Sequence, residues 1–436
     1  MKNKKNVNII TLGCSKNTVD SERLMRQLTS NQFDLVDDPN KADTVIINTC
    51  GFIEAAKEES VNTILSAIEQ KEKGKIKKVI VAGCLSERYA KELKKEIPEV
   101  DAFFGTEKYE DILNELGGKL KKELLGERAL SGPAHTAYLK ISEGCDHPCS
   151  FCAIPLMRGM HKSKPIEELV KEAEFLVRNN TRELIIIAQD TTDYGKDIYG
   201  KRCLHKLLSE LSKIEGIDWI RLMYAYPSHF PKEVINEIAR NEKICNYIDI
   251  PLQHISDSVL KSMRRGVTSK KIKELINEFK KIIPDIVLRT TFIVGYPNET
   301  EEDFNLLCNY IKETKFDRIG VFTFSVEENT SSFILGDPIP KKVKEERKNI
   351  LMEIQRKISY DNNKKLINKN LNVLLERKEG DYYIGRSYRD APEVDGEILI
   401  PVTKNSIEFG KIYNTKIYDY NEYDLFGEIT NNVEGI

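Results

Sequence analysis

Short apolar runs alternate with amphipathic stretches through the first quarter of the chain. The apolar runs lie at residues 7–14, 44–51, 78–84 and 100–105, and the stretches with helical character between them at 21–30, 53–72 and 88–95. Strands that alternate with helices predict a parallel sheet covered by helices on both faces. We therefore predict a doubly wound α/β domain over residues 1–116.

A second and longer series of the same kind follows a break in the pattern. Residues 117–136 contain Gly117-Gly118 and Ser131-Gly132-Pro133, which is typical of a linker. Candidate strands then lie at residues 137–142, 183–189, 219–224, 247–251, 286–295 and 318–325. Six strands with intervening amphipathic helices predict a partial (βα)6 barrel over residues 137–366. The charged helical stretch 339–370 is interpreted as a solvated connecting helix.

The pattern changes again in the last part of the chain. Five short β-rich runs, split by turns, lie at residues 371–375, 382–387, 396–399, 411–419 and 423–429. They predict a small five-stranded β-barrel, in a third domain that spans residues 367–436.

Composition places the chain among globular proteins of balanced charge. The hydrophobic fraction is 40%, charged residues make up 31%, and the formal net charge is −2. There is no overall basic excess of the kind expected for a protein that coats nucleic acid. Neither a signal-like apolar segment nor an apolar run long enough to span a membrane occurs, so we expect a cytoplasmic protein without membrane contact. Nine cysteines in such a protein indicate metal binding or catalysis rather than disulfides.

Three of these cysteines form a compact triplet directly after the first barrel strand. Cys145, Cys149 and Cys152 have the spacing C-x3-C-x2-C. Three thiolates on one loop can hold three irons of a cubic 4Fe-4S cluster and leave the fourth iron open. The alternatives are a zinc knuckle, which His147 could complete, or a disulfide. The barrel predicts that the triplet lies at the carboxyl ends of the strands, where such folds place their active sites.

A second set of three cysteines occupies equivalent positions in the N-terminal domain. Cys14, Cys50 and Cys84 each follow a predicted strand. The carboxyl ends of parallel strands meet at one edge, so we expect the three thiols to lie together. The sequence therefore predicts a second three-cysteine iron–sulfur cluster. Position after barrel strands also makes Gln189, Gln253 and Arg289 candidate contacts for a cofactor at the barrel mouth.

Taken together, the motifs resemble those of the radical S-adenosylmethionine (SAM) methylthiotransferases. The resemblance rests on the six cysteines, on Pro251–His254 followed by Met263–Arg265, and on the segment 293–300. It implies a radical SAM barrel and a TRAM-type C-terminal barrel. It also implies two 4Fe-4S clusters and SAM as cofactors, with Cys145, Cys149 and Cys152 as the catalytic cluster ligands and Phe151 against the adenine. The implied reaction attaches a methylthio group to an unactivated carbon, with one SAM supplying the methyl group and another the radical.

Local sequence resembles one branch of this family more than the other. Cys14-Ser15-Lys16-Asn17 and Asn48-Thr49-Cys50-Gly51-Phe52-Ile53 are similar to the branch that modifies an aspartate of a small-subunit ribosomal protein near the decoding centre. This resemblance implies that ribosomal protein as substrate, together with a sulfur donor and a reductase or flavodoxin-like electron donor. A tRNA adenosine methylthiotransferase, a zinc-holding RNA-binding module and a plain iron–sulfur electron carrier are the alternatives.

The charge of the last domain bears on the same choice. Residues 372–436 hold 13 Asp and Glu against 7 Lys and Arg, a net charge of −6. An acidic barrel suits a basic protein partner better than RNA phosphates. We therefore expect Asp390, Glu393, Asp395 and Glu397 to form an acidic surface that attracts the substrate protein, unless the acidity serves only solubility.

Overall fold

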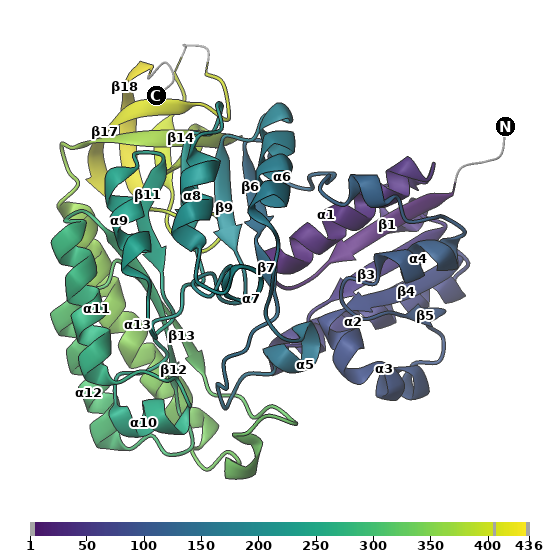
Figure 1. The fold of residues 1–436 in the computed structure, drawn as a ribbon, viewed down its shortest axis with the longest axis horizontal. Coiled ribbons are helices and arrows are strands. Elements are labelled where there is room, and N and C mark those ends of the chain that lie inside the picture. The colour runs from purple at the N-terminus through teal and green to yellow at the C-terminus, as the bar shows by residue number, and fades with distance from the viewer. Residues whose placement is uncertain (1–4, 404–406, 433–436) are drawn as a thin grey trace.

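The computed structural model of the chain describes residues 5–403 and 407–432. It contains an N-terminal sheet, a larger central sheet and a closed C-terminal barrel, which Figure 1 shows in purple, teal to green, and yellow. This arrangement confirms the predicted fold class. Among the described residues, none of the helices combines the length and the apolar character that crossing a membrane requires.

The N-terminal sheet is parallel and carries helices on both faces. Its strand order is β2-β1-β3-β4-β5. The strands are β1 Asn6–Thr11, β2 Asp34–Leu35, β3 Thr44–Thr49, β4 Lys78–Gly83 and β5 Ala102–Phe103. The helices are α1 Ser15–Ser30, η1 Pro39–Lys41, α2 Glu54–Glu72, α3 Cys84–Glu96 and α4 Tyr109–Leu116.

Alternation of side chains along the strands explains the two helical layers. Val45 and Ile47 of β3 pack with Ile64 of α2, whereas Ile46 between them packs with Leu28 of α1 on the opposite face. A strand buried on both faces needs a continuous apolar run, which is what the sequence of β3 provides. The segment after α4 holds η2 (Lys122–Leu124) before the central sheet begins.

The central sheet is an open, parallel, six-stranded half-barrel. Its order is β13-β12-β11-β10-β9-β6. The strands are β6 Thr136–Lys140, β9 Glu183–Ile187, β10 Trp219–Leu222, β11 Ile244–Asp249, β12 Val287–Val294 and β13 Arg318–Thr323, with a small antiparallel pair formed by β7 Ser142–Glu143 and β8 Lys162–Ser163. The helices are α5 Ile154–Arg158, α6 Ile166–Arg178, α7 Lys196–Tyr199, α8 Leu204–Ser212, α9 Lys232–Arg240, α10 Asp257–Ser262, α11 Ser269–Ile282, α12 Glu301–Thr314, η3 Phe333–Leu335 and α13 Lys341–Lys364.

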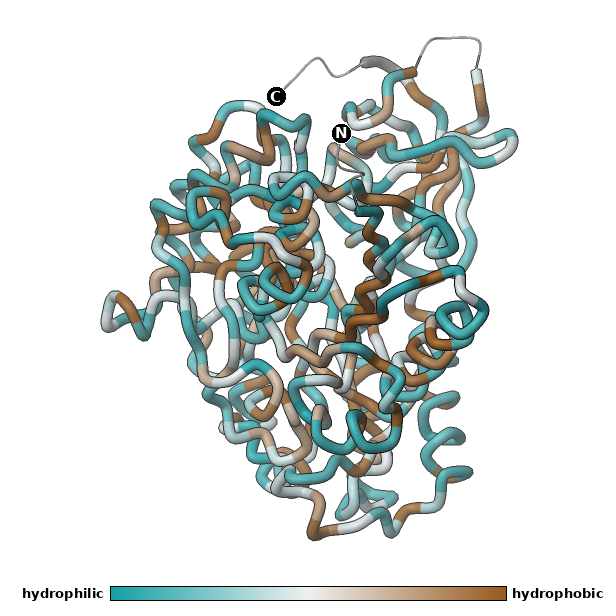
Figure 2. The backbone as a smooth tube through the Cα atoms, turned by 90° about the vertical axis from the view of Figure 1, so that its right-hand side faces the viewer, coloured by the Kyte–Doolittle hydropathy of each residue, from teal (hydrophilic) through white to brown (hydrophobic). Residues whose placement is uncertain are grey.

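The two faces of this sheet are buried against different parts of the chain. Residues such as Leu184 and Ile186 face the surrounding helices in the largest apolar core. The intervening residues, such as Ile185 and Ile187, pack with Val19 of α1 and with side chains of the C-terminal barrel. In Figure 2 brown hydrophobic segments run through the middle of the molecule, whereas many of the outer loops are teal. The inner face of the half-barrel is therefore closed by the two flanking domains.

The prediction that the charged stretch 339–370 forms a solvated connecting helix is wrong, as the contacts of α13 show. Leu351 and Ile358 are part of the large apolar core, and Gln355 donates to the carbonyl oxygens of Phe316 and Asp317. The helix is highly charged overall, but one stripe of its side chains is buried. It therefore packs on β13 as a structural helix of the half-barrel.

The last domain is a closed five-stranded barrel in the order β14-β15-β16-β18-β17. Its strands are β14 Asn370–Glu379, β15 Tyr382–Ser387, β16 Ile398–Pro401, β17 Ile412–Tyr420 and β18 Leu425–Asn432. All neighbouring strands are antiparallel except β16 and β18, which are parallel. The barrel encloses an apolar core that includes Val373, Leu375 and Ile417.

Candidate active site between the two cysteine triads

The first triad lies on the loop that follows β7 at the mouth of the half-barrel. Cys145, Cys149 and Cys152 are free thiols and are partly buried. Backbone bonds fix the loop, because the Cys152 N–H donates to the Cys149 carbonyl at 3.2 Å and the Ser150 N–H to the Met263 carbonyl at 3.0 Å. The three sulfur atoms are thus presented by one ordered turn rather than by separate elements.

The surroundings of these thiols suit metal ligation. Burial raises the pKa of Cys145 and of Cys152 to about 12. Such thiols keep their protons in water, and a bound metal displaces those protons when it binds. Arg265 Nη1 donates to Cys149 Sγ at 3.3 Å, and the Tyr226 hydroxyl lies 3.6 Å from the same sulfur. The Tyr226 O–H itself donates to the Arg265 carbonyl, so Arg265 is the donor aimed at this sulfur, and a cationic donor of this kind fits a cluster-bound thiolate.

The second triad gathers at the carboxyl edge of the N-terminal sheet, as predicted. Cys14 precedes α1, Cys50 follows β3, and Cys84 is the first residue of α3. Gly13 has φ +92°, and a Cβ there would lie 2.7 Å from Cys50 Cβ, so the two loops touch. Burial raises the pKa of Cys84 to about 12, and nearby Arg158 only partly offsets this.

Asn17 joins the loops that carry the second triad. Its amide donates to the carbonyls of Leu12 at 2.7 Å and Thr49 at 3.1 Å, and its side-chain oxygen lies 3.8 Å from Cys84 Sγ. The three thiols therefore come from three elements that are held by one buried side chain. Three free thiols on a held scaffold fit a three-cysteine cluster site.

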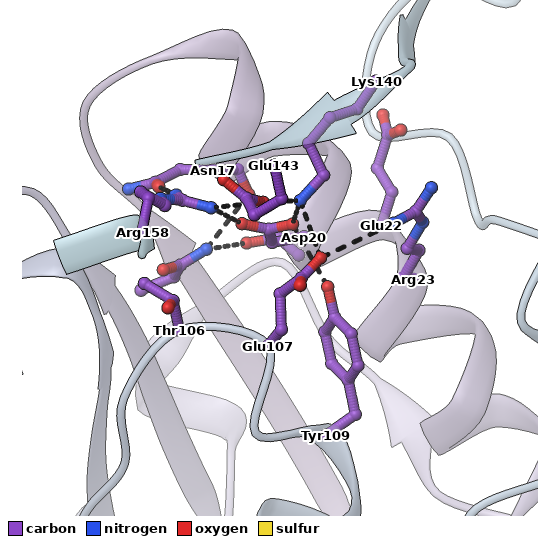
Figure 3. Close-up of polar contacts among 12 residues, drawn as sticks. Asn17, Asp20, Glu22, Arg23, Thr106, Glu107, Tyr109, Lys140, Glu143 and Arg158 are labelled. Atoms are coloured by element: carbon purple, nitrogen blue, oxygen red, sulfur yellow. Dashed lines mark hydrogen bonds and ion pairs between the residues drawn. The ribbon is translucent and has the colours of Figure 1, made fainter. Parts of the chain in front are cut away.

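Arg158, on the helix that follows the first triad, reaches the second one. Its Nε donates to Cys84 Sγ at 3.2 Å, and its Nη1 binds Asp20 at 2.7 Å and Glu143 at 3.1 Å. A further hydrogen bond runs from Nη2 to Asn17, as Figure 3 shows. A single guanidinium thus links the cluster loop of the half-barrel to the cysteine edge of the N-terminal sheet.

Lys140 completes this polar network. Its ammonium contacts Asp20, Glu143 and, at 2.9 Å, Glu107 (Figure 3). These three carboxylates are close enough together to suggest a metal site, but the ammonium already lies among them. Burial by itself raises the pKa of Asp20, yet Lys140 and Arg158 outweigh it and hold that pKa well below its ordinary value.

His147 contacts groups other than the triad. Its Nε2 lies 2.6 Å from Asp190 Oδ2, and its ring stacks on Tyr226 with the centroids 3.6 Å apart. In this arrangement Nε2 does not complete a zinc site with the three cysteines. Phe151 packs with Met263 and Tyr296 behind the cluster loop.

Two of the three predicted cofactor contacts lie at the barrel mouth. Gln189 follows β9 and donates to Glu143, and Gln253 bridges to β12 with a positive φ of 74°. The side-chain amide oxygens of both residues are buried without a partner among the described residues. Unsatisfied buried oxygens at the barrel mouth fit a ligand that donates hydrogen bonds, as the amino group of SAM does.

Arg289 lies elsewhere, so the positional argument for it was wrong. It is the third residue of β12, not a residue at its carboxyl end, and it binds Asp249 at 2.9 Å. Its Nε also lies 3.5 Å from Asp395 of the last domain. A cofactor role for Arg289 stays a prediction without positional support.

The acidic surface proposed for the last domain is also wrong in part. Asp390 binds Arg318 at 2.8 Å, and Asp395 accepts a hydrogen bond from Tyr247 at 2.6 Å. Both carboxylates are buried against the half-barrel, whereas Glu393 is exposed and Glu397 pairs with Arg377. The turn that carries these residues docks the barrel and does not offer four free charges.

Several residues of the site were not identified as functional from the sequence. Folding brings Arg158 to Cys84 and Tyr226 to Cys149. It also brings Lys140 to Asp20, which Arg158 binds as well. For Arg265 a signal existed in the Met-Arg-Arg motif, and for Arg158 in its position six residues after Cys152. His254, the last residue of the motif Pro251–His254, is fully buried.

Comparison with known proteins agrees with this architecture. Family models match residues 6–105 (uncharacterized protein family UPF0004), 139–311 (radical SAM superfamily) and 367–430 (TRAM domain). In solved structures, the radical SAM methyltransferase TsrM from Kitasatospora setae, with cobalamin and a 4Fe-4S cluster bound, matches with TM-score 0.55 and 13% identity over 76% of this chain and 77% of that one. The cobalamin-dependent SAM radical enzyme OxsB matches with TM-score 0.51 and 14% identity over 80% and 56%. These likenesses show the fold.

The family model and the curated relatives together define a radical SAM methylthiotransferase that uses SAM and iron–sulfur chemistry. Curated relatives named ribosomal protein uS12 methylthiotransferase RimO are 54% identical in Christiangramia forsetii (98% of this chain, 95% of the relative) and 53% identical in Flavobacterium johnsoniae (98% of each). A relative of the same name in Bacteroides fragilis is 48% identical over 98% of this chain and 99% of its own length. The chain belongs to the RimO family.

Proposed function

We propose that the enzyme inserts a methylthio group at the unactivated β-carbon of an aspartate in ribosomal protein uS12. The proposed reaction uses two SAM-dependent steps, a methyl transfer and a radical activation of the C–H bond. The names of the relatives and the branch-specific sequence around Cys14 and Cys50 support this substrate. The observation that carries the proposal is the presence of two separate cysteine triads joined through Arg158.

Each triad is proposed to hold one 4Fe-4S cluster. Three cysteine ligands leave one iron open, so when bound the clusters supply a chelation site and an electron for SAM at the first triad and a site for sulfur at the second. The protein positions these sites: Arg158 fixes the loops against each other, while Gln189 and Gln253 offer acceptors to SAM. Phe151 is proposed to lie on the adenine side.

The division of labour among domains is part of the same proposal. Residues 1–116 would carry the second cluster, 137–366 the radical chemistry and 367–436 the TRAM barrel, with 117–136 as linker. A reductase or flavodoxin-like protein would supply electrons, and a separate donor would supply sulfur.

Mass spectrometry of a reconstituted reaction tests the substrate. Anaerobically reconstituted enzyme is incubated with SAM, a sulfide source, dithionite and either purified uS12 within small subunits or total tRNA. We expect the mass increase of one methylthio group on a uS12 aspartate and none on tRNA. If tRNA adenosine is modified and uS12 is not, the enzyme belongs to the tRNA-modifying branch instead.

Cysteine variants separate the two triads. Cys149→Ala should abolish formation of 5′-deoxyadenosine from SAM, because the first cluster loses a ligand. Cys50→Ala should keep SAM cleavage but stop methylthiolation and lose about half of roughly eight irons per chain. The buried thiol Cys308, outside both triads, gives the matched control Cys308→Ala, which should retain both activities. Full iron and full methylthiolation in Cys50→Ala would contradict the second cluster.

A further inference from the structure

Arg265 is a buried cation whose charge is not balanced by a carboxylate. Its side chain contacts Cys149 Sγ at 3.3 Å and the carbonyl oxygen of Pro251, and its guanidinium stacks on the Tyr226 ring at 4.3 Å. Among the described residues it forms no ion pair, and its buried Nε has no hydrogen-bond partner. Every other polar contact of its guanidinium is to a neutral group.

An isolated buried charge is costly, because the interior solvates it poorly. The contact that can become anionic is Cys149, once that thiol is a metal-bound thiolate. Tyr226 holds the guanidinium in place, since its hydroxyl donates to the Arg265 carbonyl at 2.7 Å and its other ring face stacks on His147. The charge of Arg265 is therefore balanced only when negative charge is present at the first triad.

Arg158 at the second triad provides an internal comparison. It also donates to a cysteine, but Asp20 and Glu143 bind its guanidinium directly. Its charge is balanced before any thiolate forms. Among the described residues, each triad thus has one arginine donor. The charge of Arg158 at the second triad is balanced by carboxylates, whereas the charge of Arg265 at the first triad is not.

We infer that Arg265 is the counter-cation of the cluster at Cys145, Cys149 and Cys152 and raises its reduction potential. The inference requires a cluster at this triad, as the family indicates, but not the identity of the substrate. Hydrogen bonds to sulfur and local net charge set such potentials. The reduced cluster carries one more negative charge than the oxidised one, so a desolvated cation 3.3 Å from a ligand sulfur favours reduction. Arg265 acts through the cluster and is a positioning residue.

A redox titration followed by electron paramagnetic resonance tests this role. The full-length chain with Cys14→Ala, Cys50→Ala and Cys84→Ala is reconstituted with iron and sulfide, so that the signal comes from the first triad alone. In this background Arg265→Gln should lower the ratio of reduced to oxidised cluster at least tenfold at a fixed applied potential. For a one-electron couple this corresponds to about 59 mV.

Two further variants separate charge from shape. Arg265→Lys keeps the charge and should restore most of the potential. Arg264→Gln removes the neighbouring exposed arginine, which contacts Ser331 at 3.2 Å, and should leave the potential unchanged. Iron content and the thermal midpoint of each variant are measured alongside, because loss of folding lowers both.

The outcomes are distinct. An unchanged potential in Arg265→Gln with normal iron content overturns the inference, and so does an equal shift in Arg264→Gln. If Arg265→Gln binds no iron while Arg265→Lys binds it at the wild-type potential, the need for charge is upheld. Loss of iron in both variants would assign Arg265 a purely structural role. Failure of uS12 modification in the wild type affects none of these readings.

Discussion

At the scale of single residues, His254 illustrates a side chain whose role is internal. It is fully buried, its Nδ1 accepts a hydrogen bond from the Ser256 N–H at 3.0 Å, and its Nε2 lies 3.8 Å from Glu299. The accepting Nδ1 places the proton of the neutral ring on Nε2. Burial lowers the pKa of His254 to about 4. The folded protein therefore holds this histidine in its neutral form.

This depressed pKa predicts an acid-sensitive contribution to stability. An unfolded histidine titrates near pH 6.5, so the contribution is present above that pH and is lost as pH falls towards 4. Between pH 7 and pH 5 it amounts to about 2 kcal/mol of the free energy of unfolding. Thermal denaturation at both pH values should show a smaller drop in midpoint for His254→Gln than for wild type. The exposed control His229→Gln should follow wild type, and equal pH dependence in all three would contradict the buried neutral ring.

Cysteine spacing identified the candidate ligands, but their neighbours required the fold. Cys145, Cys149 and Cys152 are close in sequence, so a motif sufficed. Arg158 meets Cys84 across two domains, and no local pattern encodes that contact. The strand that carries Arg289 was predicted closely, at 286–295, but residue 289 lies near its beginning, so membership of the strand did not place this side chain at the carboxyl end.

At the scale of elements, the seam between α1 and β6 depends on charge pairing. Lys140 of β6 is buried and contacts Asp20 of α1, Glu107 before α4 and Glu143 of β7. Burial by itself lowers the pKa of Lys140, but the three carboxylates outweigh it and keep the ammonium charged. One cation thus pairs with acids from three segments.

Removing this cation should weaken the seam strongly. Lys140→Met leaves the buried carboxylate of Asp20, together with Glu143 and Glu107, with Arg158 and Arg23 as the remaining cations, and breaking the buried Lys140–Asp20 pair in this way costs about 3–5 kcal/mol. We expect a lower thermal midpoint at pH 7 and faster hydrogen exchange in α1. The exposed pair Lys73–Glu69 gives the control Lys73→Met, with an expected loss below about 0.5 kcal/mol. Similar midpoints for the two variants would show that the seam does not depend on Lys140.

Element positions were more predictable than element ends. Helix α1 begins at Ser15 and α3 at Cys84, several residues before the starts predicted at 21 and 88. The first two turns of α1 are mostly polar and have no apolar period to detect, yet Lys16, Asn17 and Asp20 in them are buried. Their partners lie in other segments, so the pattern of one helix could not indicate them.

At the scale of the whole molecule, the C-terminal barrel closes the inner face of the half-barrel. Leu374 and Ile412 pack with Ile185 and Tyr247 there. Charged pairs border this contact: Arg386 binds Glu183 at 2.7 Å, in addition to the bonds of Asp390 and Asp395. Hydrophobic periodicity predicted the folds of the three domains but not how they dock. Docking depends on isolated charges that lie opposite each other and are far apart in the sequence.

Reversing the docking charges should release the barrel rather than only change how it binds a substrate. Asp390→Lys with Asp395→Lys would place two ammonium groups beside Arg318 and Arg289 in a buried contact, which electrostatics opposes. We expect a larger radius of gyration in small-angle scattering and new proteolysis after α13. The matched control is Glu393→Lys with Glu428→Lys, which makes the same change of net charge at two exposed positions and should keep the compact shape. If the docking variant stays compact while its affinity for a basic protein falls in a salt-dependent way, the acidic turn is an external surface after all. If only the control pair loses that salt-dependent affinity, the exposed acids attract the partner and the buried ones hold the molecule together.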